Sequence, residues 1–226
     1  MCGRFSFVAS QEKIQHQLGL DFETGANLRI NFNIAPTQHA YVITNEKPRA
    51  LQYLTWGLIP SWSNDGKNIG QLINARSEGI ETKPSFRVPI RKNRCLVLAD
   101  SFYEWKQQGG EKVPYRILLR NGDLMLMAGI WDVWYKGDYA IRSFSIITCP
   151  PNQEMTGIHN RMPVIFDRIS DQQKWLSDLS LDEVLPMLHT PENGILDMYK
   201  VSFKVNSVKN NSPDLHQRIG DTPTLF

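Results

Sequence analysis

The longest strand-like stretch of the chain reads LMLMAGIWDVWY-KGD-YAIRSFSIIT and spans Leu124–Thr148. Its two apolar halves are rich in aromatic and β-branched residues, which favour strands. The Lys136-Gly137-Asp138 segment between them is typical of a hairpin turn, because glycine tolerates the backbone conformation that a tight reversal needs. The stretch therefore predicts a long antiparallel hairpin at the centre of the fold.

Strand signals continue on both sides of this hairpin and outnumber the helix signals. No regular alternation of strands with helices is present, so a parallel nucleotide-binding sheet is not expected. The pattern predicts a single α+β domain over residues 1–226, rich in antiparallel strands and with peripheral helices. The further expected strands are Arg4–Val8, Ala40–Thr44, Arg49–Thr55, Arg94–Ala99, Phe102–Lys106, Pro114–Leu119, Met162–Phe166 and Tyr199–Phe203.

Helices are few, and the sequence marks their ends. Ser10 is placed to cap a helix that runs to Leu18 and stops at Gly19. Two other segments have a serine followed three residues later by Gln or Glu, the capping-box pattern of a helix start. These segments are Ser170–Gln173 and Ser180–Glu183, and a proline-interrupted helical period covers Ser77–Lys92.

The composition is that of an ordinary globular protein, with 226 residues, 41% hydrophobic and 21% charged. The net charge is only +2, so a nucleic-acid site would have to be a local cluster of Arg and Lys. The sequence shows neither a signal peptide nor an apolar run long enough to span a membrane. We expect a cytoplasmic protein, associated with the nucleoid or nuclear in a eukaryote, and no membrane partner.

The three cysteines, Cys2, Cys95 and Cys149, are far apart and show no CxxC spacing. Neither a zinc site nor a disulfide framework is indicated, and the histidines form no HxxxH or HExxH pattern. Cys95 and Cys149 lie in strand-like apolar runs, where a buried structural role is expected. No metal and no cofactor are expected.

Cys2 differs because the chain begins Met1-Cys2-Gly3-Arg4. A small second residue permits removal of Met1, which would leave an α-amine and a thiol on one residue. Their ordinary pKa values are about 7.7–8.0 and 8.5. An amine and a thiol so placed can condense with an aldehyde, the amine giving a Schiff base and the sulfur closing a five-membered thiazolidine. The plainer explanation is a cysteine in a disordered start.

Other segments place polar residues within apolar surroundings. In Leu72–Glu78 an apolar lead-in precedes Asn74 and Arg76, which share a face if the backbone is extended. Asn74 can hydrogen-bond a hydroxyl or a developing oxyanion, and Arg76 can bind a phosphate through two hydrogen bonds. A turn asparagine and a surface arginine are the plainer interpretation.

Glu104 lies among aromatic residues in Ala99–Trp105, where desolvation would raise its pKa and suit proton transfer near neutral pH. A solvent-facing glutamate on an edge strand is the alternative. His159 lies in the loop Gly157–Pro163, just ahead of an expected strand, where scaffolds often present functional side chains. A lone loop histidine is more often simply exposed.

The loop Trp56–Trp62 contains two tryptophans among Gly and Pro residues, and both cannot be core. A loop tryptophan near arginines fits a base-stacking platform. It can equally close the end of a barrel.

Taken together, collinear motifs cover about residues 2–210 and leave 211–226 as a C-terminal tail. They are Met1–Arg4, Asn33–Pro36, Trp56–Leu58 with Pro60 and Trp62, Asn74–Glu78, Arg94–Leu96, Phe102–Trp105, Ala128–Trp131 and Ile158–Pro163. In these motifs the chain resembles the SRAP domain family, whose members crosslink to abasic sites in single-stranded DNA. Ser101 stands where the family usually has glycine, which raises the question whether the turn ahead of Glu104 is unchanged.

The resemblance implies a barrel-like SRAP fold and a set of catalytic roles. Met1 would be removed, and Cys2 would form a thiazolidine with C1′ of the ring-opened abasic deoxyribose. Asn74 would orient the amine and the sugar, Glu104 would shuttle protons, and His159 would assist ring opening and Schiff-base turnover. The resulting DNA–protein crosslink would shield the lesion. The family name also records a proposed peptidase activity, removal of the residue ahead of Cys2.

The resemblance further implies a monomer that binds single-stranded DNA containing abasic sites. Arginines would hold phosphates, and a proline and a tryptophan would stack on flanking bases. Such a strand is kinked, so single strands or junctions would be preferred over duplex. The expected DNA-binding residues are Arg4, Asn33, Pro36, Trp62, Arg76, Arg161 and Met162.

Two other functional classes remain open from the residues. An N-terminal Cys-Gly also begins the class II glutamine amidotransferases, in which the thiol attacks an amide. That mechanism needs an Asn-Gly oxyanion element, and the chain has such pairs only at Asn121-Gly122 and Asn193-Gly194. A non-catalytic single-strand binder would explain the tryptophans and arginines but would leave Cys2, Glu104 and His159 without a role.

Overall fold

A β-barrel forms the centre of the molecule. The computed structural model describes residues 2–21, 27–66 and 70–219. Within them, five strands close the barrel in the order β10, β4, β3, β6 and β9, with β9 pairing back onto β10. The β10–β4 pairing is parallel and the other pairings of the ring are antiparallel. Their bounds are β3 His39–Thr44, β4 Lys47–Trp56, β6 Arg94–Ala99, β9 Met125–Lys136 and β10 Tyr139–Cys149.

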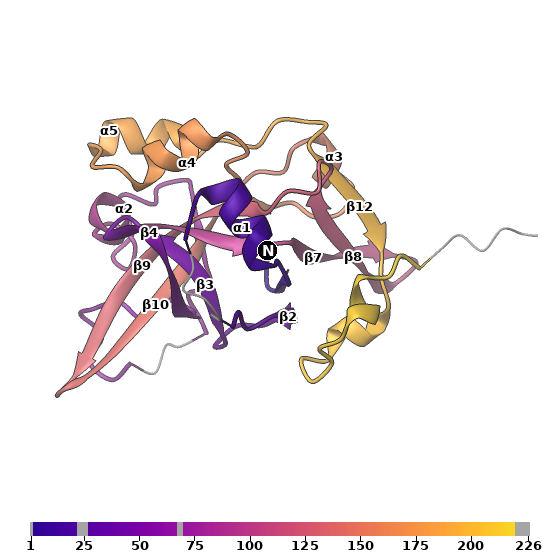
Figure 1. Cartoon of the computed structure of the whole chain (residues 1–226), viewed down its shortest axis with the longest axis horizontal. Helices are drawn as coiled ribbons and strands as arrows, with labels where there is room; N and C mark the ends of the chain where they lie inside the picture. Colours follow the sequence, from indigo (N-terminus) through magenta and orange to yellow (C-terminus); the bar gives the residue numbers. More distant parts are fainter. Residues whose placement is uncertain (1, 22–26, 67–69, 220–226) are drawn as a thin grey trace, which may run out of the picture.

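The predicted central hairpin is confirmed. β9 and β10 pair in unbroken antiparallel register from Tyr139 opposite Lys136 to Ile146 opposite Gly129. Gly137 in the connecting turn has a φ of 58°, a conformation that costs a residue without Cβ little. Figure 1 shows the tip of this hairpin projecting away from the second sheet.

The second sheet is antiparallel, and five strands of the described chain form it in the order β12, β8, β7, β1 and β2. β1 lies between β7 and β2, so the segment ahead of β1 enters the molecule beside β7. The α+β class with predominantly antiparallel strands is therefore confirmed. The bounds are β1 Phe5–Phe7, β2 Asn31–Ile34, β7 Ser101–Gln108, β8 Glu111–Leu119 and β12 Leu196–Lys200.

Two short strands lengthen the barrel at the carboxyl end of β10. β5 (Asn74–Arg76) runs parallel to β10, with Thr148 opposite Arg76. β11 (Met162–Pro163) pairs antiparallel, with Cys149 opposite Met162. Two segments far apart in sequence, one carrying Asn74 and one following His159, therefore meet at one end of one strand.

The helices lie outside the sheets. α1 (Gln11–Leu18) confirms the predicted helix, since the Ser10 hydroxyl accepts from the Lys13 N–H at 3.2 Å and Gly19 ends it at φ 62°. The capping box at Ser180 is also present, at the start of α5 (Leu181–Val184). The other helical segments are α2 Pro89–Lys92, α3 Gln153–Thr156, α4 Ile169–Leu176, η1 Leu185–Met187, η2 Phe203–Asn206 and η3 Pro213–His216.

The predicted helix start at Ser170–Gln173 is wrong by about two residues. α4 begins at Ile169 with Arg168 as its N-cap, so Ser170 lies inside the first turn. Over 77–92 only α2 is α-helical, and turns occupy the rest. The strand expected at Tyr199–Phe203 lies earlier, as β12, because the Ser202 hydroxyl accepts from the Lys204 N–H and begins η2.

The barrel core is apolar, and it also holds one end of α4 through a buried cation. Cys95 and Cys149 are fully buried, as expected of structural cysteines. Arg94 in β6 is 1% exposed. Its guanidinium donates to the carbonyl oxygens of Trp175 at 3.0 Å and Ser177 at 2.6 Å. A buried charge is tolerated when its donors are satisfied, and here they bind the end of α4 to the barrel.

The C-terminal segment packs against the second sheet as far as residue 219. Leu215 in η3 is fully buried, and the Tyr199 hydroxyl donates to the His216 carbonyl at 2.9 Å. The Ile219 N–H donates to the Lys200 carbonyl at 2.9 Å. Of the tail expected at 211–226, residues 211–219 are thus part of the packed structure, and 220–226 lie outside the described residues.

Across the described ranges, no helix is long and apolar enough to cross a membrane.

Substituting Gly129 by alanine should destabilise the barrel. A Cβ at this position in β9 would lie 2.8 Å from Cys95 Sγ and 3.2 Å from the backbone oxygen of Ser145. Overpacking of this kind costs about 1–3 kcal/mol. We expect a lower unfolding midpoint in urea for Gly129→Ala. Gly157→Ala is the matched control, since its Cβ would meet no described atom within 4 Å; equal midpoints for the two variants would contradict the expectation.

Candidate active site

Cys2 lies in an extended segment that runs into β1 beside β7. The Tyr103 N–H donates to the Arg4 carbonyl at 2.9 Å, which fixes this segment against β7. Cys2 is fully buried. Burial, and then the negative charge of Glu104, raise the pKa of its thiol. The sulfur is therefore held as a neutral thiol, mainly by burial.

Asn74 holds the Cys2 backbone from the barrel side. β5 places it opposite Ile146 of β10, and its Nδ2 donates to the Cys2 carbonyl at 2.8 Å. Its Oδ1 is buried and has no hydrogen-bond partner among the described residues. An N–H or O–H group arriving beside Cys2 would find an acceptor there.

Glu104 and His159 face each other next to this segment. Glu104 in β7 is 3% exposed, and its Oε2 lies 3.9 Å from His159 Nε2. The Arg161 N–H donates to His159 Nδ1 at 3.0 Å. Nδ1 also lies 3.3 Å from the Arg161 carbonyl oxygen, but the backbone N–H is the nearer partner and can only donate. We therefore assign Nδ1 as the acceptor and place the proton of a neutral imidazole on Nε2, the nitrogen that faces the carboxyl group.

Glu104 and His159 open onto a pocket of about 750 Å³. This volume lies in the range of pockets that bind small organic groups. Sequence reasoning did not single out Trp105, Gln107, Lys112, Asn160 or Asn206 as pocket residues. The β7–β8 register, which sets Gln107 opposite Lys112, could have indicated Lys112. The lining residues are Glu104, Trp105, Gln107, Lys112, Ile158, His159, Asn160 and Asn206.

The side chains of Arg4 and Asn33 form hydrogen bonds within the protein. Arg4 Nη1 donates to Asn33 Oδ1 and to the Val205 carbonyl, both at 2.7 Å. Asn33 is 1% exposed, and its Nδ2 donates to the carbonyls of Ser207 at 3.0 Å and Asn210 at 2.9 Å. The two side chains therefore bind residues 205–210 to β2. The sequence predicted a DNA contact for them and did not indicate this structural role.

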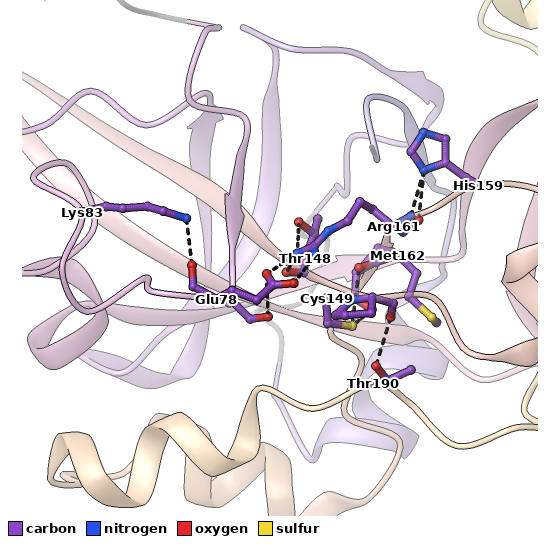
Figure 2. A network of polar contacts seen from close by, with 11 residues as sticks. Glu78, Lys83, Thr148, Cys149, His159, Arg161, Met162 and Thr190 are labelled. Carbon is purple, nitrogen blue, oxygen red and sulfur yellow. Dashed lines mark hydrogen bonds and ion pairs between the residues drawn. The ribbon is translucent and has the colours of Figure 1, made fainter.

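Arg161 and Met162 are also largely enclosed. Arg161 is 9% exposed, and its guanidinium pairs with both carboxylate oxygens of Glu78, at 2.8 Å for Nη2–Oε2 (Figure 2). Met162 is fully buried, and its sulfur accepts from the Asn152 N–H at 3.2 Å. Burial leaves Met162 no surface in this conformation with which to contact a DNA strand.

Arg76, Trp62 and Pro36 remain accessible. Arg76 at the end of β5 is exposed, and no hydrogen bond or ion pair is seen for its guanidinium within the described ranges. Trp62 is 60% exposed, with its indole N–H 3.4 Å from the Pro84 carbonyl, whereas Trp56 is fully buried. Pro36 is half-buried in the turn after β2. The two tryptophans thus differ as expected, one in the core and one at the surface.

Ser101, the departure from the family pattern, begins β7 without a positive φ. Its hydroxyl lies 2.7 Å from that of Ser6 and accepts from Arg116 Nε at 2.8 Å. The strand that carries Glu104 is therefore regular from its first residue.

These features define a class of protein: a β-barrel with an antiparallel second sheet, in which a thiol at the second residue lies beside a carboxyl–imidazole pair at a pocket. The chain belongs to the SOS response associated peptidase (SRAP) family, whose sequence pattern matches residues 1–208.

Relatives and a solved structure agree with this assignment. The chain is 39% identical to the abasic site processing protein YoqW of Bacillus subtilis (strain 168), over 95% of this chain and 98% of that protein. It is 34% identical to the abasic site processing protein HMCES of Gallus gallus, over 78% of this chain and 60% of that protein. A crystal structure of a protein from Bacteroides thetaiotaomicron superposes with a TM-score of 0.86 at 30% identity, covering 96% and 99% of the two chains.

Proposed function

We propose that this protein processes abasic sites in single-stranded DNA by forming a covalent crosslink through Cys2 after removal of Met1. The observation that carries the proposal is the convergence of four side chains from separate segments. Asn74 bonds the Cys2 backbone at 2.8 Å, and Glu104, whose charge acts on the Cys2 thiol, lies 3.9 Å from His159. The names of the relatives point to the same lesion.

The chemistry follows from the two nucleophiles of an N-terminal cysteine. The α-amine adds to the C1′ aldehyde of the ring-opened sugar, and loss of water gives an imine. The thiol then adds to the imine carbon, its proton goes to nitrogen, and a thiazolidine ring closes. Imine formation takes a proton from the amine and gives one to the departing water, and Glu104 is the carboxyl group placed to carry both.

Asn74 and His159 support these steps from either side. The buried Oδ1 of Asn74 can accept from the Cys2 amine or from a sugar hydroxyl. His159 presents Nε2–H beside Glu104, where it can protonate the sugar ring oxygen during opening and assist turnover of the Schiff base. Schiff-base turnover of this kind would give the protein a lyase-like activity.

The DNA would approach over the exposed side chains. Arg76 is placed to hold a phosphate, and Trp62 and Pro36 offer surfaces on which bases can stack. Arg4 and Arg161 would bind phosphates only through donors left over from their internal contacts. Such a partner places the protein at the nucleoid, or in the nucleus of a eukaryote, and a monomer suffices for every contact proposed.

The same site is compatible with a peptidase step that removes Met1, in which the Cys2 thiol would attack the Met1 carbonyl and the Cys2 amine would leave. Water would then hydrolyse the resulting thioester, releasing methionine and restoring the thiol. The amidotransferase alternative has less support. Neither Asn121-Gly122 nor Asn193-Gly194 is among the described residues that line the pocket.

Intact mass spectrometry tests the proposed function. Incubation with a single-stranded oligonucleotide that carries one abasic site should give a species with the mass of the Met1-free protein plus DNA minus one water. An oligonucleotide with a tetrahydrofuran in place of the abasic sugar is the control, because it has no aldehyde. Absence of the adduct with the aldehyde form would overturn the proposal.

Arg76→Ala should reduce the salt dependence of DNA binding. Each phosphate contact on a single strand contributes about −0.7 to the slope of log K against log salt. Three contacts would give a slope near −2, and loss of the exposed Arg76 should make it shallower by about 0.7. Fluorescence anisotropy with an intact oligonucleotide measures this. Arg218→Ala removes an exposed arginine that pairs with Asp197 and serves as control; equal slopes for both variants would exclude Arg76 from the interface.

A further inference from the structure

Glu78 is an acidic residue in a site expected to bind a polyanion. It follows β5 by two residues, and its carboxylate takes both terminal nitrogens of Arg161 (Figure 2). The side chain of Glu78 is 55% exposed, whereas that of Arg161 is 11% exposed. The Arg161 guanidinium lowers the pKa of Glu78 to about 2, so the carboxylate is ionised throughout the neutral range.

The pair joins the two segments that meet at the end of β10. Arg161 Nη2 also donates to the Thr148 carbonyl, and the Ser77 N–H donates to the same oxygen at 2.8 Å. The segment that follows Asn74 and the segment that follows His159 are therefore held on one residue of β10. Figure 2 shows Glu78, Thr148 and Arg161 converging there.

Arg161 in turn orients His159 through its backbone. Its N–H donates to His159 Nδ1 at 3.0 Å, and the opposite ring nitrogen lies 3.9 Å from Glu104. If the Arg161 side chain moved out toward solvent, this N–H would be free to turn away from the ring. The ring would then lose the contact that keeps its proton on Nε2.

The charges explain why Glu78 is needed to prevent that movement. Without the carboxylate, the enclosed guanidinium would keep only neutral acceptors of Thr148, and an uncompensated buried charge is strongly unfavourable. A nearby phosphate would then draw Arg161 outward. With the carboxylate in place, Arg161 is already neutralised and remains at β10.

We propose that Glu78 is a positioning residue for His159: by pairing with Arg161 it holds the Arg161 N–H on His159 Nδ1 and so presents Nε2–H to Glu104. This inference rests on the proposed function only in that His159 then acts on the sugar. The main role of Arg161 is then to orient His159, and binding a phosphate is its secondary role.

Glu78→Gln tests the inference, since it keeps the shape and removes the charge. Long-range ¹H–¹⁵N correlation spectra of the DNA-free protein report the tautomer. The wild type should show a single Nε2–H form of His159, and the variant should show mixed Nδ1–H and Nε2–H signals. In single-turnover crosslinking at saturating DNA, the variant should be about 10- to 10²-fold slower, the effect of a misplaced catalytic group. Its affinity for intact single strands should rise, because a carboxylate is lost.

Glu46→Gln is the matched control. It removes the carboxylate of another Arg–Glu pair, with Arg142, and changes the net charge equally. This variant should retain the wild-type His159 signals and crosslinking rate. A general effect of charge would alter both variants alike and would overturn the inference.

Arg161→Lys provides a second route if Glu78→Gln folds poorly. It keeps the charge and the backbone N–H but loses the forked contact with Glu78 and Thr148. The same change in His159 signals is expected. A variant that combines Glu78→Gln with Arg161→Lys should crosslink no more slowly than the slower of the two single variants. Unchanged His159 signals in both variants would overturn the inference. A wild type that forms no crosslink would instead refute the proposed function and leave the tautomer measurement to decide this one.

Discussion

Protein that retains Met1, or that carries any tag ahead of Cys2, is expected to form no thiazolidine crosslink. In such a chain the Cys2 nitrogen is a peptide amide, whose lone pair is delocalised into the carbonyl group and is not nucleophilic. The thiol alone can add to an aldehyde only reversibly, as a hemithioacetal. Mass analysis of active protein should therefore show Cys2 as the first residue, and crosslinked species should be absent from the Met1-retaining fraction.

The variant Cys2→Ser, with Met1 removed, is the informative control. It keeps an α-amine in the same place but lacks the sulfur that closes the ring. We expect no stable adduct, yet an imine that borohydride can trap. A Met1-retaining preparation that crosslinks as fast as processed protein would rule out the thiazolidine mechanism, whatever the behaviour of the serine variant.

Local sequence signals were sufficient for the long elements and insufficient for the short ones. The β9–β10 hairpin and α1 were predictable because apolar periodicity, a turn glycine and a capping serine coincide there. β2 and β5 were not expected as strands. They are three or four residues long and contain asparagines, which are depleted in strands, so only pairing with β1 and β10 makes them extended.

The candidate site, too, could be predicted from the sequence only in part. Residue chemistry picked out Cys2, Asn74, Glu104 and His159, and the fold brings them together. Sequence could not indicate which basic residues have internal partners, since the Glu78–Arg161 pair joins positions 83 apart in sequence. Nor could it place Asn206 at the pocket, because that contact depends on how residues 205–210 return to β2.

Glu104→Gln is expected to slow crosslinking about 10²- to 10⁴-fold, the usual contribution of a general acid–base group. Glutamine keeps the shape of the side chain and cannot transfer a proton. Affinity for intact single-stranded DNA should change little, because Glu104 is 3% exposed. The measurement is single-turnover crosslinking with saturating abasic oligonucleotide, followed from acid to alkaline pH.

The effect of Glu104→Gln on the Cys2 thiol distinguishes imine formation by the amine from ring closure by the sulfur. Burial is the main cause of the raised pKa of the Cys2 thiol and the Glu104 charge is the second, so removal of that charge lowers the pKa only in part and does not reduce the thiolate fraction. Sulfur addition should therefore be no slower in Glu104→Gln, and any loss of rate must arise in imine formation. Rapid borohydride quenching, which traps the imine, should show it accumulating more slowly than in the wild type.

His159→Ala should behave differently, because the proposed role of His159 is to open the sugar ring and turn over the Schiff base. We expect slow reaction on the cyclic sugar, slow reversal and weak strand cleavage, with a nearly normal rate once the aldehyde is free.

If Glu104→Gln instead reacted at the wild-type rate at every pH, Glu104 could not be the proton carrier. That role would then pass to His159, whose Nε2 lies 3.9 Å from the carboxyl group, or to a water held by the free Oδ1 of Asn74.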